Sequence, residues 1–170
     1  MLKVLGILCI LAGTVGIGRE LCGYLNNHLK QLLECREIFT QADTQREYLR
    51  LPYAQLLRRI AKGKSRLFGD ILYQIAEEME KSKEADIGKL WEEAFLSKKG
   101  QLLLDKEEQE LFVALARSLG LEGNHTKVSE IYFLQLEDEV VQAMEEKKEK
   151  QKLYGTISVL SGLFLVILLL

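Results

Sequence analysis

Apolar residues recur along this chain at spacings of three and four, which is typical of amphipathic helices, and no segment alternates with a period of two. The pattern predicts helices over residues 21–49, 53–61, 67–83, 87–96, 105–120 and from residue 126 onward. Pro52 separates the first two, because the residue before a proline is biased away from helix. Asp105 and Glu108 form a predicted capping pair. The short connections favour an all-α fold, a six-helix antiparallel bundle.

Two stretches with almost no charge lie at the ends of the sequence. Residues 154–170 (YGTISVLSGLFLVILLL) carry no charge and reach about 26 Å as a helix, close to the ~30 Å thickness of a bilayer core. Residues 2–18 carry only Lys3. The alternatives are a buried core helix for the last stretch and a cleaved signal peptide for the first, although residues 14–18 offer a poor cleavage site. We therefore expect the bundle, at residues 19–152, to be flanked by one N-terminal and one C-terminal transmembrane helix.

Small residues recur on one helix face in each end stretch, and such faces let membrane helices approach closely. If the two helices run antiparallel, Gly13 lies at the depth of Ser158. The hypothesis is that they pack as a hairpin, and the alternative is that glycine is simply common in membrane helices. The predicted packing residues are Gly6, Gly13, Gly16, Gly155, Ser158 and Gly162.

The distribution of basic residues predicts where the bundle lies. Arg19 follows the first apolar stretch, and Lys147, Lys148, Lys150 and Lys152 precede the second. Because an excess of Lys and Arg marks the cytoplasmic side of membrane helices, we expect a cell-membrane protein with a cytoplasmic helical domain.

Composition and motifs argue against several functions. The net charge of −2 leaves no basic stripe for nucleic acid. Gly63 opens a G-K-S triplet, but Arg58 stands where a phosphate loop needs its first glycine, and the preceding residues read as a helix. His28 and His125 have no ligands at metal spacing, and the three cysteines form no evident pair. We therefore expect no enzyme activity, cofactor, metal or small-molecule substrate.

Carboxylates cluster on the third and fourth predicted helices. They could form a docking surface for a basic partner, since opposed charge speeds encounter and selects partners. The alternative is an ordinary solvated helix surface. The residues concerned are Glu77, Glu78, Glu92 and Glu93.

Several dispersed positions give the chain a family resemblance. They are residues 48–61 (YLRLPYAQLLRRIA), Trp91 within LWEEAF, Leu119 with Gly120, and the leucine-rich run after Gly162. In these residues the sequence resembles the stage III sporulation protein AB family of endospore-forming bacteria. It departs from the family pattern at Leu51, Gly123 and Lys127, which puts loop-specific contacts in question more than the fold.

The resemblance implies a six-helix domain similar to the cytoplasmic domains of inner-membrane platform proteins in type II secretion and type IV pilus systems. It implies a non-enzymatic scaffold in the channel complex between mother cell and forespore, on the mother-cell side. The implied partners are a cytoplasmic secretion-type ATPase and other membrane proteins of that complex. The alternative function is a two-span membrane sensor whose helical bundle binds a ligand outside the cytoplasm.

Overall fold

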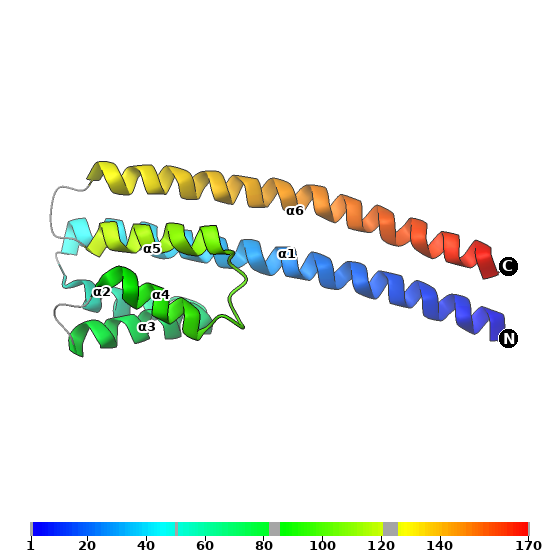
Figure 1. The fold of residues 1–170 in the computed structure, drawn as a ribbon, viewed down its shortest axis with the longest axis horizontal. Coiled ribbons are helices and arrows are strands. Elements are labelled where there is room, and N and C mark those ends of the chain that lie inside the picture. Colours follow the sequence, from blue (N-terminus) through cyan, green and yellow to red (C-terminus); the bar gives the residue numbers. More distant parts are fainter. Residues whose placement is uncertain (1, 50, 82–85, 121–125, 170) are drawn as a thin grey trace. The chain divides into compact units, whose positions relative to one another are not determined.

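A computed structural model describes residues 2–49, 51–81, 86–120 and 126–169. These residues form six helices (Figure 1), namely α1 (Leu2–Leu49), α2 (Tyr53–Ala61), α3 (Arg66–Lys81), α4 (Ile87–Ser97), α5 (Lys106–Gly120) and α6 (Thr126–Leu169). The chain divides into two compact units. The first comprises Met1–Leu29 with Val141–Leu170, and the second comprises Lys30–Val140.

The helix ends follow the signals in the sequence. Pro52 lies immediately before α2 with ψ 141°, an extended conformation, and its carbonyl accepts the Leu56 N–H at 3.1 Å. Asp105 and Glu108 form the predicted capping box at the start of α5. The Asp105 N–H donates to a Glu108 carboxylate oxygen at 2.8 Å, and the Glu108 N–H donates to Asp105 Oδ1 at 2.8 Å. The two side chains thereby satisfy backbone donors that the helix itself leaves unpaired.

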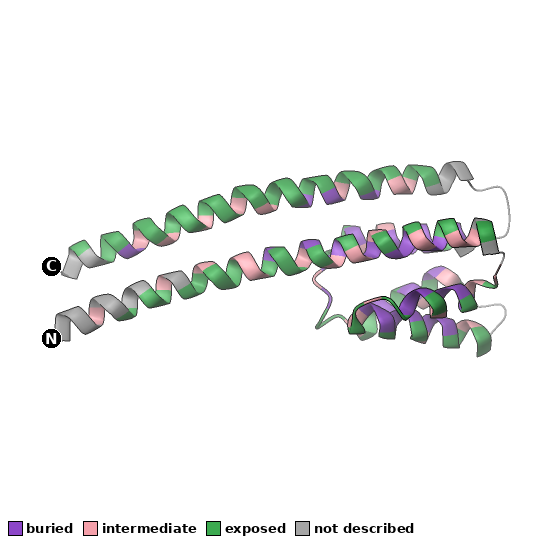
Figure 2. Ribbon diagram, turned by 180° about the vertical axis from the view of Figure 1, so that it is seen from behind, coloured by how far each residue is buried: buried purple, intermediate pink, exposed green. Residues whose placement is uncertain are grey.

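The core of the second unit is built around an aromatic cluster. Phe39 of α1 lies 5.1 Å from Trp91 of α4 and 5.6 Å from Phe112 of α5, measured between ring centroids. Trp91 also meets Phe95 edge-on at 5.5 Å. In Figure 2 the buried positions of α2 to α5 follow one side of each helix. Other large side chains that are almost fully buried include Leu32, Ile38, Leu56, Leu57, Phe68, Ile71, Leu72 and Ile75.

Polar side chains of α1 hold the connections of the second unit. The Gln31 amide donates to the Gln101 carbonyl at 3.0 Å and accepts the Leu103 N–H at 2.8 Å. One turn further on, Glu34 accepts the Ser65 N–H and Glu37 contacts Lys64 Nζ at 2.8 Å. The turn between α2 and α3 and the connection from α4 to α5 are therefore both fixed to α1.

In the first unit, residues 2–29 of α1 lie beside residues 141–169 of α6. Lys147 Nζ donates to Asn26 Oδ1 at 2.7 Å, and Leu25, Leu29 and Ala143 are buried. Most of the large apolar side chains whose burial is described in this unit are exposed instead, as in Ile17, Leu21, Tyr24, Leu153, Ile157, Val159, Leu160, Leu163, Phe164 and Ile167.

The predicted flanking transmembrane helices at residues 2–18 and 154–170 need correction. In the described part of the chain, no helix has both the length and the apolar character needed to cross a membrane. That part of the predicted fold class is therefore wrong. Glycine and threonine interrupt residues 2–18, and serine interrupts residues 154–170 as well. Each stretch is one end of a much longer helix that continues into charged sequence.

Candidate functional site

The predicted acidic surface lies on two neighbouring helices of the second unit. Ser97 Oγ of α4 donates to Gln74 Oε1 of α3 at 3.3 Å, so the two helices lie side by side. The four predicted docking carboxylates are all exposed, with Glu77 and Glu78 on α3 and Glu92 and Glu93 on α4.

The two pairs differ in their ion-pair contacts. Lys81 Nζ lies 3.2 Å from Glu77 and 2.8 Å from Glu78, and these contacts raise the pKa of Lys81, Glu78 more than Glu77. Among the described residues, no ion pair reaches Glu92 or Glu93. The α4 carboxylates are therefore the more available part of the surface, and its docking role stays a prediction.

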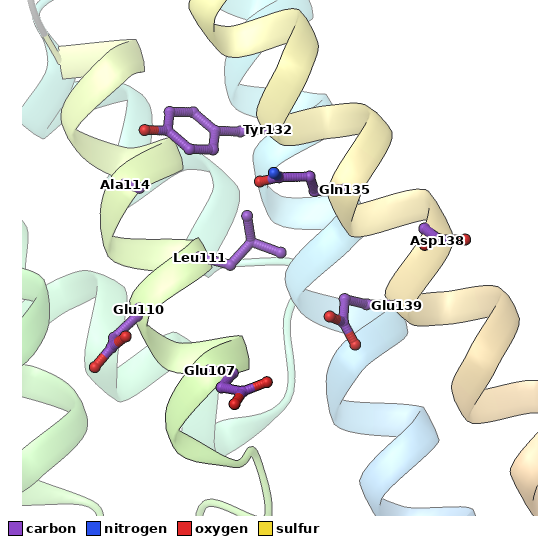
Figure 3. Close-up of a pocket in the computed structure, with 8 residues that line it drawn as sticks. All are labelled: Glu107, Glu110, Leu111, Ala114, Tyr132, Gln135, Asp138 and Glu139. Carbon is purple, nitrogen blue, oxygen red and sulfur yellow. The ribbon is translucent and has the colours of Figure 1, made fainter.

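A groove that sequence reasoning did not identify lies between α5 and residues 126–140 of α6. Its volume is about 410 Å³. Leu111 and Tyr132 point into the gap between the helices, and Glu107 and Glu139 stand across from each other at one end (Figure 3). The eight lining residues are Glu107, Glu110, Leu111, Ala114, Tyr132, Gln135, Asp138 and Glu139. Four of these are carboxylates and none is basic, so the groove combines an apolar floor with an acidic rim.

Glu139, a half-buried residue of the groove, has a shifted carboxyl pKa. Burial is the largest cause that raises the pKa of its carboxyl above the usual value. Three carboxylates at the start of α5, Glu108, Asp105 and Glu107, raise it further, as does the adjacent Asp138. Negative charges on two helices therefore oppose one another across the groove, which disfavours the ionised form of Glu139.

Contacts on either side fix the two helices that form the groove. The capping box sets the first turn of α5, where Glu108 is buried and 3% exposed. The Arg46 guanidinium of α1 donates to the Leu119 carbonyl near the end of α5. On α6, Glu137 accepts from Arg36 Nε at 2.5 Å.

A second, larger groove of about 900 Å³ runs between α4 and α5. Its apolar side chains include Phe95, Leu96 and Val113, and Leu96 is 69% exposed. The charged residues that line it have both signs: Lys99, Lys106 and Arg117 with Glu92 and Glu110.

The G-K-S triplet has a structural role. Gly63 follows α2, and Lys64 and Ser65 are held by Glu37 and Glu34 of α1. The side chain of Lys64 is only 2% exposed, so it is buried against its carboxylate partner. The described residues contain no group of three or more His, Cys, Asp or Glu that could hold a metal ion. His28 lies within α1, and His125 lies outside the described residues.

The surroundings of four of the predicted packing glycines are described, and the packing role of the set stays a prediction. A Cβ built on Gly6, Gly13, Gly16 or Gly155 would meet nothing within 4 Å. A Cβ on Gly18 would lie 2.9 Å from Ser158 Oγ and 3.7 Å from Ser158 Cβ. Gly162 is buried on α6. The structure thus places Ser158 beside Gly18, about one and a half helical turns along α1 from the predicted neighbour Gly13.

Comparison with known proteins gives the chain its family. The sequence model of the family described as Stage III sporulation protein AB matches residues 3–170. The chain belongs to the stage III sporulation protein AB family. It is also 24% identical over 179 residues to "Stage III sporulation protein AB" of Bacillus subtilis (strain 168), with all of both chains covered. No solved structure matches the chain significantly.

The membership confirms the family resemblance seen in the sequence and supports a sporulation-related role. The match runs through both units, so the α5–α6 groove and the acidic surface on α3 and α4 both lie within the part that defines the family.

The approach of Gly18 to Ser158 predicts a specific crosslink. In a chain whose native cysteines at 9, 22 and 35 are replaced, Gly18→Cys with Ser158→Cys should form a disulfide under mild oxidant, because a Cβ separation of 3.7 Å suits the bond. The crosslink would close a large loop, which non-reducing electrophoresis detects as altered mobility. Gly13→Cys with Ser158→Cys is the matched control and should link far less. Equal linking of both pairs would contradict this packing.

The raised pKa of Glu139 predicts a pH-dependent stability. Because the folded protein holds the proton more tightly than the unfolded chain, this group lowers the free energy of unfolding as pH rises through the range just above 4.5. Glu139→Gln should therefore raise the free energy of unfolding at neutral pH. Since the site is partly exposed and screened, the gain should be about 0.5 kcal/mol or less.

The gain in the free energy of unfolding from Glu139→Gln should vanish at pH values below the usual carboxyl pKa, because the native glutamate is then neutral too. Urea unfolding followed by circular dichroism at neutral and acidic pH measures both values. Glu130→Gln, on an exposed part of the same helix, is the control for loss of one charge and should show no such gain. A Glu139→Gln chain that is no more stable than wild type at neutral pH would show that the repulsion is negligible.

Proposed function

We propose that this chain is a non-enzymatic scaffold of a secretion-like channel complex between mother cell and forespore, in which it docks a cytoplasmic ATPase and other membrane proteins of the complex. The observation that carries the proposal is the family match over residues 3–170, which supports a sporulation role. A helical unit with charged outer faces and a well-packed aromatic core suits a rigid docking body. In this role the chain transmits force or fixes assembly, and the ATPase performs the hydrolysis.

The acidic surface on α3 and α4 supports an electrostatic mode of docking. Glu92 and Glu93 are exposed and free of ion pairs within the described residues, so a basic surface can meet them without breaking an existing contact. Glu77 and Glu78 must share Lys81 with any partner. The α4 pair should therefore contribute more to partner binding than the α3 pair.

Charge reversal tests this docking surface. Glu92→Lys with Glu93→Lys should weaken binding of the purified ATPase by about tenfold or more, because like charges replace opposite ones at the contact. The same reversal at Glu77 and Glu78 should have a smaller effect. Biolayer interferometry on immobilised full-length chain measures both.

The matched control is Glu145→Lys with Glu149→Lys, two exposed carboxylates on α6 in the first unit. It reverses the same amount of charge away from the proposed surface and should leave ATPase binding within twofold. If the α4 reversal leaves binding unchanged, Glu92 and Glu93 are ordinary solvated residues. If the wild-type chain shows no binding to the ATPase at all, the proposed partner is wrong.

We propose that the chain is located at the cell membrane, with the second unit in the cytoplasm on the mother-cell side. The exposed apolar side chains of the first unit support this placement. Leu160 is 62% exposed and Phe164 is 64% exposed, one turn apart on α6. Contiguous exposed apolar side chains of this kind mark surfaces that contact lipid or another protein.

Membrane association can be measured by flotation of the full-length chain with lipid vesicles in a density gradient. Leu160→Asp with Phe164→Asp should reduce the floated fraction by about tenfold or more, because burying such side chains is worth about 1.5 to 3 kcal/mol each. Leu96→Asp replaces an apolar side chain of similar exposure in the second unit and should float like wild type. Equal flotation of all three chains would locate the lipid contact elsewhere.

A further inference from the structure

The α5–α6 groove has a shape that selects for an elongated, amphipathic occupant. Its floor is formed by Leu111, Ala114 and Tyr132, and its volume of about 410 Å³ is sufficient for side chains that reach in from outside. Exposed apolar residues lengthen this strip on α6. Ile131 is 56% exposed and Leu134 is 66% exposed, one turn before Gln135 and Asp138.

The charge of the groove selects for a basic occupant. Glu107 and Glu139 face each other at one end of the groove (Figure 3). Glu110 and Asp138 also line it, but their carboxylates lie on the outer sides of α5 and α6. Two basic residues on flanking elements are already engaged: Lys106 with Glu110 at 3.2 Å and Arg36 with Glu137 at 2.5 Å. A cation placed between Glu107 and Glu139 would relieve repulsion that the chain itself leaves in place.

The chemistry of the lining narrows the choice of cation. A hard metal ion needs several oxygen ligands converging on one point, and the described residues contain no such group. Lysine and arginine side chains suit the groove better, because their aliphatic stems lie along apolar surface while the charged heads reach carboxylates. In the groove, Glu107 and Leu111 are four residues apart on α5. A partner helix with basic and apolar residues four positions apart on one face would match that spacing.

We propose that the α5–α6 groove binds a basic amphipathic helix of a partner protein, whose lysine or arginine heads meet Glu107 and Glu139 and whose apolar side chains contact Leu111 and Tyr132. This goes beyond the proposed function, because it needs no ATPase and uses a surface separate from Glu92 and Glu93. The groove between α4 and α5 does not lead to an equivalent proposal, since its rim carries both signs of charge and selects no partner charge.

The proposal is tested with the full-length chain and a fluorescent peptide of about four helical turns made of leucine and lysine. A matched peptide has glutamate in place of lysine. We expect fluorescence anisotropy to detect binding of the lysine peptide alone, weakened when salt rises from about 50 mM to about 500 mM. Glu107→Gln with Glu139→Gln should weaken this binding by about tenfold or more.

Two further variants separate groove binding from general attraction to an acidic protein. Glu77→Gln with Glu78→Gln removes the same charge outside the groove and should keep the affinity within twofold. Gln135→Lys supplies a cation inside the groove and should both compete with the peptide and raise Tm. Gln55→Lys adds the same charge on an exposed part of α2 and should do neither.

The proposal is overturned if the Glu107→Gln, Glu139→Gln chain binds as tightly as wild type, if the Glu77→Gln, Glu78→Gln chain loses as much, or if the glutamate peptide binds equally well. Measuring ATPase binding on the same chains keeps the two proposals apart. Loss of peptide binding with unchanged ATPase binding supports the groove as an independent site. Loss of ATPase binding only in the Glu92→Lys, Glu93→Lys chain concerns the scaffold proposal alone.

Discussion

The second unit depends on burial of the aromatic cluster in which Phe39 joins Trp91 and Phe112. These three rings come from α1, α4 and α5, so a single cluster fixes three helices that lie far apart in sequence. Truncation of a buried aromatic of this size typically costs about 3 to 5 kcal/mol, a large part of the stability of a small domain. The cluster also sets the rotation of α5 about its axis. With Phe112 directed inward, Glu107, Leu111 and Ala114 share a different face and reach the groove.

α1 provides the second constraint by holding connections that the aromatic cluster does not reach. Gln31, Glu34 and Glu37 lie on successive turns and bind the α4–α5 connection and the α2–α3 turn. Buried or half-buried polar contacts of this kind add modest stability but specify which loop conformation accompanies the packed helices. The start of α5, and with it Glu107, is therefore placed both by its capping box and by the fixed connection that precedes it.

Much of the helical pattern could be predicted from sequence, because the signals are local. Pro52, the capping pair Asp105 and Glu108, and apolar spacing identified α2 to α5 with bounds that the structure reproduces within a few residues. The helix predicted over residues 21–49 is longer in the structure, where α1 begins at Leu2. The α5–α6 groove could not be predicted in this way. It exists only because residues about thirty positions apart come together, and neither helix alone shows that Glu107 will face Glu139.

At the ends of the chain one sequence signal was misleading, and another did not determine how the two helices align. The run of apolar residues at each end suggested membrane spans, but the same stretches contain small and polar residues that a count of missing charges overlooks. The glycine spacing suggested Gly13 as the neighbour of Ser158, whereas Gly18 is the closer residue. Periodicity gives the face of a helix reliably, but it does not give the axial register between two helices, which depends on how whole side chains interlock.

The stability of the free chain does not account for the placement of Glu107 on α5 opposite Glu139 on α6. The Glu108 carboxylate accepts the Asp105 N–H in the capping box, and the Glu137 carboxylate pairs with Arg36. Each of these two negative charges therefore makes a contact within the chain. Glu107 and Glu139 make neither kind of contact within the described residues, and burial, together with nearby carboxylates that include Glu107, raises the pKa of Glu139. A glutamine at either position would preserve the size of the side chain and remove the repulsion. Proteins break such local rules chiefly at functional sites, where interaction with another molecule offsets the cost. The same two carboxylates that weaken the free chain are thus the ones that a basic partner would contact.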